Sequence, residues 1–296
     1  MKVLVTGTSG QLGHDTMLEL KKRGIDCLGA DRRGEKNQEF QTTTLDITDK
    51  EAVEKTLSEY HPDVVIHCAA WTNVDAAEDP ANLAAVRKVN VDGTANLAKA
   101  CHQIGAKIVY ISTDYVFNGQ GDKPWQPDDK NFEPLNVYGQ SKLDGEKAVV
   151  DNTDKYFIVR IAWVFGKNGN NFVKTMLTVG KNHDEVRVVN DQIGTPTYTP
   201  DLSRLLVDMI LTDKYGFYHA TNEGGYISWA DFTKEIFKKA NIHSKVIPVT
   251  TAEYGASVAK RPFNSRLDKS KLKANGFTLL PTWQDALSRY LAELEA

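Results

Sequence analysis

The sequence predicts an α/β fold, with a doubly wound parallel sheet followed by a smaller C-terminal α/β lobe. Short apolar runs alternate with amphipathic stretches over residues 1–160. The apolar runs are continuous, which is typical of strands buried on both faces of a parallel sheet. Repeated strand–helix–strand units are joined by right-handed crossovers. The pattern loosens after residue 160 without any Pro/Gly/Ser linker, so we expect the second lobe to pack directly on the first.

The strands expected in this sheet are short apolar runs. They are Lys2–Thr6, Ile25–Asp31, Val64–Cys68, Lys107–Thr113 and Tyr156–Arg160. The helices expected between them carry apolar residues at helical spacing. They are Gln11–Arg23, Lys50–Tyr60, Leu83–Gln103 and Val137–Val150.

The rest of the chain holds one long loop and weaker elements. Asn118–Asn136 contains three prolines and two glycines, so we expect a loop of the length that often forms a lid or a binding segment. Strands are expected at Val186–Val189 and Gly216–Ala220. Ser228–Ala240 is expected as a helix with a serine N-cap and an aspartate three residues later, a variant of the capping box. A final amphipathic helix begins near Thr282.

The composition is that of an ordinary globular protein. The 296 residues are 41% hydrophobic and 25% charged, and 36 Lys+Arg against 39 Asp+Glu give a net charge of −3. No apolar run approaches the roughly 18 residues that span a bilayer, and the first glycine comes too early for a signal peptide. The charges are interspersed, so we expect neither nucleic acid nor a membrane as a partner. The expected location is the cytoplasm; a homodimer is compatible with the sequence, which does not count subunits.

The cysteines and histidines do not indicate a metal site. Cys27, Cys68 and Cys101 are far apart and lack C-x-x-C spacing, so neither a disulfide framework nor a zinc site is expected. We interpret them as core thiols. The histidines show no metal-ligand spacing either, so no metal is expected.

Three glycines follow the first strand at the spacing G-x-x-G-x-x-G. Glycine permits the sharp turn, close approach of a pyrophosphate to the backbone, and close packing of helix on strand. The helix that begins there offers free N–H groups and a partial positive charge to phosphates. This context predicts a Rossmann-like dinucleotide-binding site. The loop residues expected to contact the cofactor are Gly7, Ser9, Gly10, Gln11, Leu12 and Gly13.

The residues at the end of the second strand do not decide whether the cofactor carries a 2′-phosphate. Asp31 lies near the offset expected for an acid that binds the adenosine ribose, and its charge favours NAD. Arg32 and Arg33 follow directly and favour the 2′-phosphate of NADP. Either NADH or NADPH is therefore expected. Asp46 and Ile47 either flank the adenine or simply begin the next helix.

Tyr138 is the one tyrosine of eleven with a lysine, Lys142, four residues later. The pair begins a predicted helix, so both side chains share a face. An ammonium close to a phenol is expected to lower the phenol pKa from about 10 toward neutrality. Such a tyrosine exchanges a proton with a carbonyl or alcohol oxygen while hydride moves at the adjacent carbon.

A third group is needed to orient that oxygen. Ser112 and Thr113 end the fourth strand, at the carboxyl edge where α/β sheets bind ligands. Adjacent strand residues point to opposite faces, so one of the two is expected to meet the substrate. Periodicity does not choose between them.

These motifs together resemble the extended short-chain dehydrogenase/reductase superfamily, and longer phrases resemble one of its families, dTDP-4-dehydrorhamnose reductase. The resemblance covers essentially the whole chain. The phrases are residues 112–119 (STDYVFNG), 160–166 (RIAWVFG), 189–197 (VNDQIGTPT), 261–265 (RPFNS) and 281–283 (PTW).

The resemblance implies reduction of the C4 ketone of dTDP-4-dehydro-β-L-rhamnose by NADH or NADPH, the last step of dTDP-L-rhamnose biosynthesis. It assigns Thr113 to orienting the oxygen, Tyr138 to proton donation, and Lys142 to the nicotinamide ribose and to tuning Tyr138. We expect a dinucleotide-binding Rossmann domain at 1–165 and mainly a smaller nucleotide-sugar lobe at 166–296, and the strands near 186–189 and 216–220 could belong to the first domain. Further residues expected to line the cofactor are Ala69, Ala70 and Thr72.

Three residues are expected on the sugar-nucleotide side. The resemblance implies Trp163 and Asn171 as sugar contacts, and Trp163 as a core aromatic is the alternative. A guanidinium binds phosphate oxygens in a bidentate fork, so Arg261 is a candidate for the diphosphate. An ion pair at the surface or between the lobes is the alternative for Arg261.

Two other functions compete with a reductase. A nucleotide-sugar epimerase or dehydratase of the same superfamily would return the hydride, and the related 4,6-dehydratases carry an Asp-Glu pair after the threonine. Thr113-Asp114-Tyr115 lacks that glutamate. A non-catalytic NADP-binding regulatory subunit is the second alternative, since fold does not fix activity. The complete set of Thr113, Tyr138 and Lys142 favours an enzyme.

Overall fold

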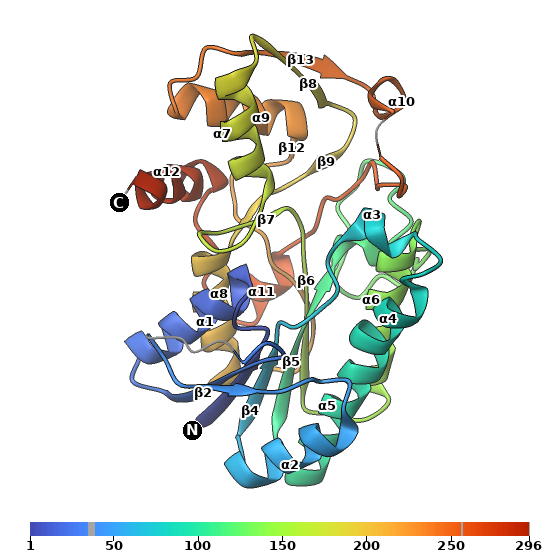
Figure 1. Cartoon of the computed structure of the whole chain (residues 1–296), viewed down its shortest axis with the longest axis vertical. Coiled ribbons are helices and arrows are strands. Elements are labelled where there is room, and N and C mark those ends of the chain that lie inside the picture. The colour runs from blue at the N-terminus through green and yellow to red at the C-terminus, as the bar shows by residue number, and fades with distance from the viewer. Residues whose placement is uncertain (35–38, 256, 296) are drawn as a thin grey trace.

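The computed structural model describes residues 1–34, 39–255 and 257–295, and its centre is a seven-stranded parallel sheet (Figure 1). The strand order is β11-β6-β5-β4-β1-β2-β3. Every neighbouring pair runs parallel, which confirms the predicted fold class. The strands are β1 (Lys2–Thr6), β2 (Asp26–Asp31), β3 (Thr42–Thr44), β4 (Val64–His67), β5 (Lys107–Thr113), β6 (Tyr156–Ile161) and β11 (Gly216–His219).

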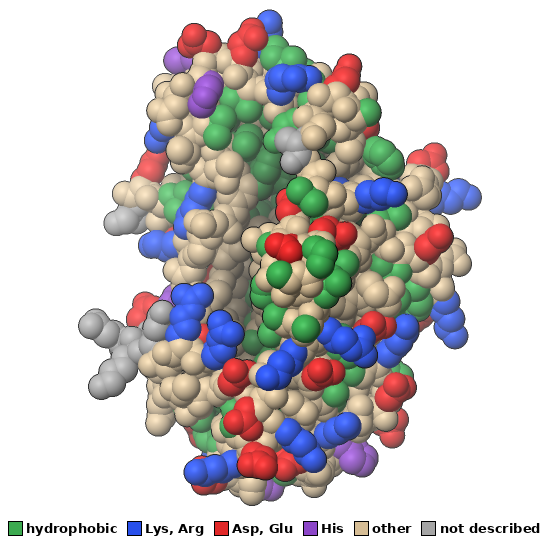
Figure 2. Space-filling model, turned by 45° about the vertical axis from the view of Figure 1, so that its right-hand side comes forward, with side chains coloured by type: hydrophobic (Ala, Val, Ile, Leu, Met, Phe, Trp, Pro, Cys, Tyr) green, Lys and Arg blue, Asp and Glu red, His purple; other side chains and the backbone are tan. Residues whose placement is uncertain are grey.

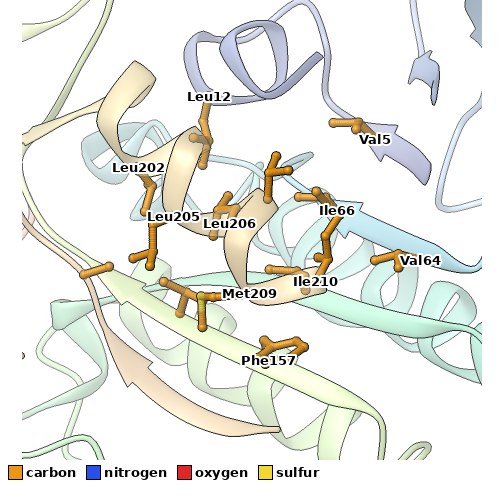
Figure 3. Packing of buried hydrophobic residues seen from close by; sticks show 14 of the residues in the cluster. Val5, Leu12, Val64, Ile66, Phe157, Leu202, Leu205, Leu206, Met209 and Ile210 are labelled. Carbon is orange, nitrogen blue, oxygen red and sulfur yellow. The ribbon is translucent and has the colours of Figure 1, made fainter. Parts of the chain in front are cut away.

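Helices cover both faces of this sheet. On one face lie α1 (Gln11–Lys22) and α8 (Thr199–Ile210), whose apolar sides meet the strands in one core. Figure 3 shows Leu12 of α1 and Leu202 to Ile210 of α8 pointing toward Val5, Ile66 and Phe157 of the sheet. On the other face a second core forms under α2 (Lys50–Tyr60), α5 (Thr94–Ile104) and α6 (Val137–Val150).

The strand order reverses at β1, where the two halves of the sheet meet. From β1 the chain moves outward to β2 and β3, and then returns to the other side of β1 with β4. Crossover connections leave a crevice at such a switch point, outside the carboxyl ends of the strands. The glycine loop after β1 and the ends of β4 and β5 all meet there.

A smaller lobe lies above the carboxyl edge of the sheet (Figure 1). Its core is rich in aromatic rings and joins α7 (Phe172–Asn182), α9 (Trp229–Lys239) and α12 (Trp283–Glu295). The predicted strand at 186–189 is β8 (Glu185–Val189), which pairs in parallel with β13 (Lys245–Val249) in this lobe. The predicted strand at 216–220 is instead the edge strand β11 of the large sheet. The capping box of Ser228 and Asp231 forms as expected.

Short elements complete the chain. They are α3 (Val74–Ala77), α4 (Leu83–Arg87), η1 (Lys88–Gly93), η2 (Asp114–Val116), β7 (Val164–Phe165), β9 (Ile193–Gly194), β10 (Thr197–Tyr198), β12 (Ile227–Ser228), α10 (Thr251–Tyr254) and α11 (Ser270–Ala274). Within the described ranges, no helix is both long enough and apolar enough to cross a membrane.

The helix expected at Leu83–Gln103 is not a regular α-helix. Its middle, η1, is a π-helical segment between α4 and α5. The wider turn carries Asn90, whose side chain accepts a bond from Trp71 N at 2.8 Å and donates to Trp71 O at 3.1 Å and Ser141 Oγ at 2.9 Å. The bulge therefore ties the chain after β4 to the helix that carries Tyr138, which fits the frequent placement of π-bulges at functional sites.

The loop Asn118–Asn136 is irregular, as predicted, but it does not form a lid. Trp125 stacks on Phe117 with ring centroids 4.7 Å apart and bridges to Leu267. Arg160 donates to the carbonyl of Pro127 at 3.0 Å. These buried contacts hold the loop against the C-terminal segment, and it contributes no residue to the wall of the main cavity.

Candidate active site

A cavity of about 740 Å³ opens at the carboxyl edge of the sheet, between the sheet and the smaller lobe. Figure 2 shows the surface hollowed there, with apolar side chains on its walls. The glycine loop, Trp163 and Trp229 all contribute to its wall. Predicted site residues in its wall are Gly7, Gly10, Gln11, Leu12, Gly13, Asp31, Arg32, Asp46, Ile47, Ala69, Ala70, Thr72, Thr113, Tyr138, Lys142 and Trp163.

The glycine loop has the geometry that its spacing predicts. Gly7 adopts φ +74°, and a Cβ there would lie 2.6 Å from Ala69 N. A Cβ on Gly13 would overlap the carbonyl oxygen of Gly7. Gly10 is the N-cap of α1 and provides no side-chain cap, so the first N–H groups of the helix lack a capping side chain. Such a helix start binds phosphate oxygens, which fits a dinucleotide.

Asp31 is engaged with the glycine loop. Its Oδ2 accepts bonds from Ser9 N at 3.2 Å and Ser9 Oγ at 2.7 Å, and its Oδ1 accepts from Arg33 N at 3.2 Å. Ser9 is absent from the cavity wall, whereas Arg32 and Arg33 belong to it. The carboxylate thus braces the loop, and the guanidinium of Arg32 stands exposed beside it.

Thr113, Tyr138 and Lys142 all line this one cavity. Asn136 is the N-cap of helix α6, and its side chain accepts a bond from Gly139 N at 2.7 Å, which fixes the turn that carries Tyr138. Tyr138 is half-buried and open to the cavity, while Lys142 is almost fully buried one turn further on. The Lys142 Nζ lies 4.0 Å from the centroid of the Tyr110 ring.

The pKa of Tyr138 is raised above 10, so the prediction that Lys142 lowers it is wrong. Burial is the largest cause and the charge of Asp114 adds to it, while a hydrogen bond with Thr113 opposes them. Burial also lowers the pKa of Lys142 to about 7, which weakens the ammonium that was expected to act on the phenol. The phenol is therefore protonated at neutral pH, the form that donates a proton.

The structure distinguishes Ser112 from Thr113, although both touch the cavity wall. The Ser112 hydroxyl donates to Glu146 Oε1 at 2.5 Å, on the α6 side of the sheet. The Thr113 Oγ1 donates to Asp114 Oδ1 at 3.0 Å, accepts from Tyr115 N at 3.2 Å, and pairs with Tyr138. Thr113 is thus the hydroxyl beside the phenol.

Two tryptophans of the cavity wall stack on each other. Trp163 and Trp229 stack with ring centroids 3.7 Å apart and planes 15° apart. Trp163 adopts φ +51°, a left-handed conformation that is uncommon for a bulky residue. Gly194 makes room for its ring, since a Cβ there would lie 2.9 Å from it. Backbone strain of this kind concentrates at functional sites.

Comparison with known proteins gives the family. The family model described as RmlD substrate binding domain matches residues 1–296. The dTDP-4-dehydrorhamnose reductase of Streptomyces griseus is 41% identical, over 96% of this chain and 91% of that protein. The chain belongs to the dTDP-4-dehydrorhamnose reductase family.

Two further relatives of this reductase family are similar along their whole length. The spore coat polysaccharide biosynthesis protein SpsK of Bacillus subtilis is 37% identical, over 99% of this chain and 97% of that protein. A crystal structure of dTDP-4-dehydrorhamnose reductase from Bacillus anthracis, in complex with NADP, superposes with a TM-score of 0.90 at 42% identity. That match covers 99% of each chain.

Two residues predicted as substrate contacts in this reductase have other partners. Asn171 caps α7 by accepting from Lys174 N at 3.1 Å, and its Nδ2 donates to Gln11 Oε1 and Tyr290 OH, both at 3.0 Å. It lies outside the cavity wall because these bonds hold it at the base of α7.

Arg261 also lies outside that wall. It binds Asp75 of α3 in a bidentate ion pair at 3.1 and 2.7 Å, which is the interlobe alternative that the sequence left open. This pair lowers the pKa of the Asp75 carboxyl.

Several residues that line the cavity of this reductase were not predicted from the sequence. Trp71, Asp114, Tyr115 and Trp229 belong to the wall. Asp114 and Tyr115 could have been suspected from their position after Thr113, but Trp229 is distant in sequence and shows no local signal. In the part of the chain that the structure describes, no cluster of His, Cys, Asp and Glu could hold a metal ion.

Proposed function

We propose that this chain reduces the C4 ketone of dTDP-4-dehydro-β-L-rhamnose to dTDP-L-rhamnose with NADPH or NADH. The observation that carries the proposal is the convergence of Thr113, Tyr138 and Lys142 on one cavity that begins at the glycine loop. That arrangement joins a dinucleotide-binding helix start to a phenol that can donate a proton. Family membership supplies the substrate class.

The cofactor half of the cavity is supplied by residues from the sheet domain. Gly7, Gly10 and Gly13 leave the backbone open to phosphates, and Ala69 and Ala70 form a smooth wall at the end of β4. When bound, the dinucleotide supplies the hydride that reduces the ketone. Lys142 is placed to hold the ribose next to the nicotinamide.

The proton is supplied by Tyr138. Its raised pKa keeps the phenol protonated at neutral pH, so it donates its proton to the C4 oxygen as negative charge develops there. Thr113, hydrogen-bonded to the same phenol, orients that oxygen. Burial and the charge of Asp114 dominate the pKa of this phenol, so the role left to Lys142 is to hold the cofactor ribose.

We assign binding of the sugar nucleotide mainly to the smaller lobe. We place the division near residue 165, with β11 and α8 of the later chain belonging to the sheet domain by their packing. Trp163, backed by Trp229, offers an apolar face to a sugar or base. Asn171 bonds to Gln11 and Arg261 pairs with Asp75, so we assign both to holding the smaller lobe against the sheet domain. We propose that the protein acts in the cytoplasm. We also propose that it forms a homodimer, and light scattering measures its mass in solution.

The deciding experiment follows NADPH and NADH absorbance with dTDP-4-dehydrorhamnose and with other nucleotide ketosugars. A reductase consumes one equivalent of reduced cofactor for each ketosugar. An epimerase returns the hydride and produces no net oxidation, and a regulatory subunit binds NADP without turnover. Either of these outcomes would overturn the proposal.

We expect Arg32→Ala to weaken NADPH binding about tenfold or more while NADH affinity changes little. A guanidinium forms strong, charge-assisted bonds with phosphate oxygens, and NADH lacks the 2′-phosphate. Arg32 is exposed at the cavity wall beside Asp31, whose oxygens are engaged by Ser9 and Arg33. Titrations of both cofactors by fluorescence measure the ratio. An equal loss for both would place the 2′-phosphate elsewhere.

A further inference from the structure

A buried ion pair lies behind the catalytic helix. Glu146 of α6 and Arg160 of β6 are 2% and 0% exposed. Arg160 Nε donates to Glu146 Oε1 at 2.8 Å, and its second terminal nitrogen donates to Oε2 at 2.7 Å. This bidentate geometry fixes the position of the carboxylate as well as its charge.

Arg160 is held from several sides. Its guanidinium lies 5.0 Å from the ring centroid of Phe117, 5.1 Å from that of Phe132 and 4.9 Å from that of Phe217. One terminal nitrogen also donates to Pro127 O at 3.0 Å. The cation is therefore fixed by the long loop and the sheet edge, and it holds Glu146 in turn.

Glu146 connects Arg160 both to the end of β5, which carries Thr113, and to Lys142 on α6. Its Oε1 accepts the Ser112 hydroxyl at 2.5 Å, directly before Thr113 on β5. It also lies four residues after Lys142 on the same face of α6, and its charge acts on that ammonium.

Lys142 faces few other titratable groups. From β4 and the residue after it come His67 and Cys68, and from β5 comes the ring of Tyr110. Tyr138 shares its helix. Burial lowers the pKa of Lys142 to about 7, and Glu146 is the carboxylate that opposes this shift. Burial holds His67 neutral, with its pKa lowered to about 3.

We propose that Glu146, fixed by Arg160, is a positioning residue that keeps Lys142 charged and aligns the end of β5 with α6. The inference rests on the proposed function, because it concerns how Lys142 of that site stays protonated. A buried ion pair contributes little net stability compared with apolar residues of similar volume. Its place one turn behind Lys142 gives this pair an electrostatic role.

The test is Glu146→Gln, which keeps the shape and removes the charge. Lysine labelled with ¹³C at Cε reports each ammonium by NMR, and Lys142→Met assigns the signal that titrates near pH 7. In Glu146→Gln this midpoint is expected to fall by about one pH unit. Above both midpoints, kcat/KM then falls about tenfold, because the protonated fraction falls tenfold for each pH unit.

The matched control is Asp201→Asn. Asp201 is also a buried carboxylate paired with an arginine, Arg289, at 2.7 Å, but it lies outside the cavity wall. Its loss should leave the Lys142 midpoint unchanged. If Glu146→Gln does not fold, the double variant Glu146→Gln/Arg160→Met removes both charges, and its Lys142 midpoint is expected to fall as well.

The outcomes separate two failures. An unchanged Lys142 midpoint in folded Glu146→Gln or in the double variant overturns the inference, as does a wild-type Lys142 that titrates in the ordinary lysine range. A shifted midpoint in a protein that never oxidises NADPH with the ketosugar upholds the role of Glu146 and overturns the proposed function.

Discussion

Replacement of Tyr138 by phenylalanine is expected to reduce kcat/KM for the ketosugar by about 10²–10⁴-fold, the usual worth of a positioned proton donor. The variant keeps the ring, its edge contact with Tyr115 at 5.7 Å and the helix that carries it. Cofactor affinity should therefore stay near that of the wild type. Steady-state kinetics and NADPH titration measure the two quantities separately.

The control for this variant is Tyr226→Phe. Tyr226 is partly exposed, donates to Leu267 O at 3.2 Å and lies outside the cavity wall, so turnover should be unaffected. A Tyr138→Phe variant with near-wild-type turnover would remove the phenol from the mechanism. Equal loss of cofactor affinity and turnover would show a binding role.

The sheet could be predicted because its strands are buried on both faces. Val3, Leu4 and Val5 are fully buried. A short continuous apolar run of this kind is typical of a strand in the core. The edge strand β3 is three threonines, which carry no burial pattern, and it was missed. The π-helical turn at Asn90 was also missed, and the contact that Asn90 makes with Trp71 forms only in the folded chain.

The site was predictable where its chemistry is local in sequence. The glycine spacing and the Tyr138–Lys142 spacing each lie within one turn or loop, so both could be found. The choice of Thr113 over Ser112 depended on Glu146, which comes from another element. The pKa of Tyr138 could not be predicted, because burial by the whole fold outweighs the one charge that the spacing suggested.

Two residues that the sequence predicts as ligand contacts, Arg261 and Asn171, bind other side chains in this structure. Arg261 has the chemistry of a phosphate ligand, but Asp75, far away along the chain, takes both of its terminal nitrogens. Asn171 is likewise occupied as a helix cap. A residue type shows what a side chain can bind, and the partner that actually binds it is decided by tertiary structure.

Replacement of Arg160 by methionine is expected to destabilise the protein by about 3–5 kcal/mol, because it leaves the buried carboxylate of Glu146 without its cation. The variant also loses the bond to Pro127 O, so loosening of the long loop adds to the loss. Urea unfolding, monitored by tryptophan fluorescence, measures the change in unfolding free energy. By comparison Arg289→Met, which breaks a more exposed pair with Asp201, should cost less.

The double variant Glu146→Gln/Arg160→Met decides how much of this loss comes from the unpaired charge. Removal of both charges abolishes the uncompensated carboxylate, so the double variant should be more stable than Arg160→Met alone. If it is no more stable, the loss comes from packing around Phe117, Phe132 and Phe217. If the double variant regains stability but its Lys142 midpoint stays low, the two roles of the ion pair are separate. The fold then does not need the pair, whereas Lys142 needs the charge of Glu146 to stay protonated.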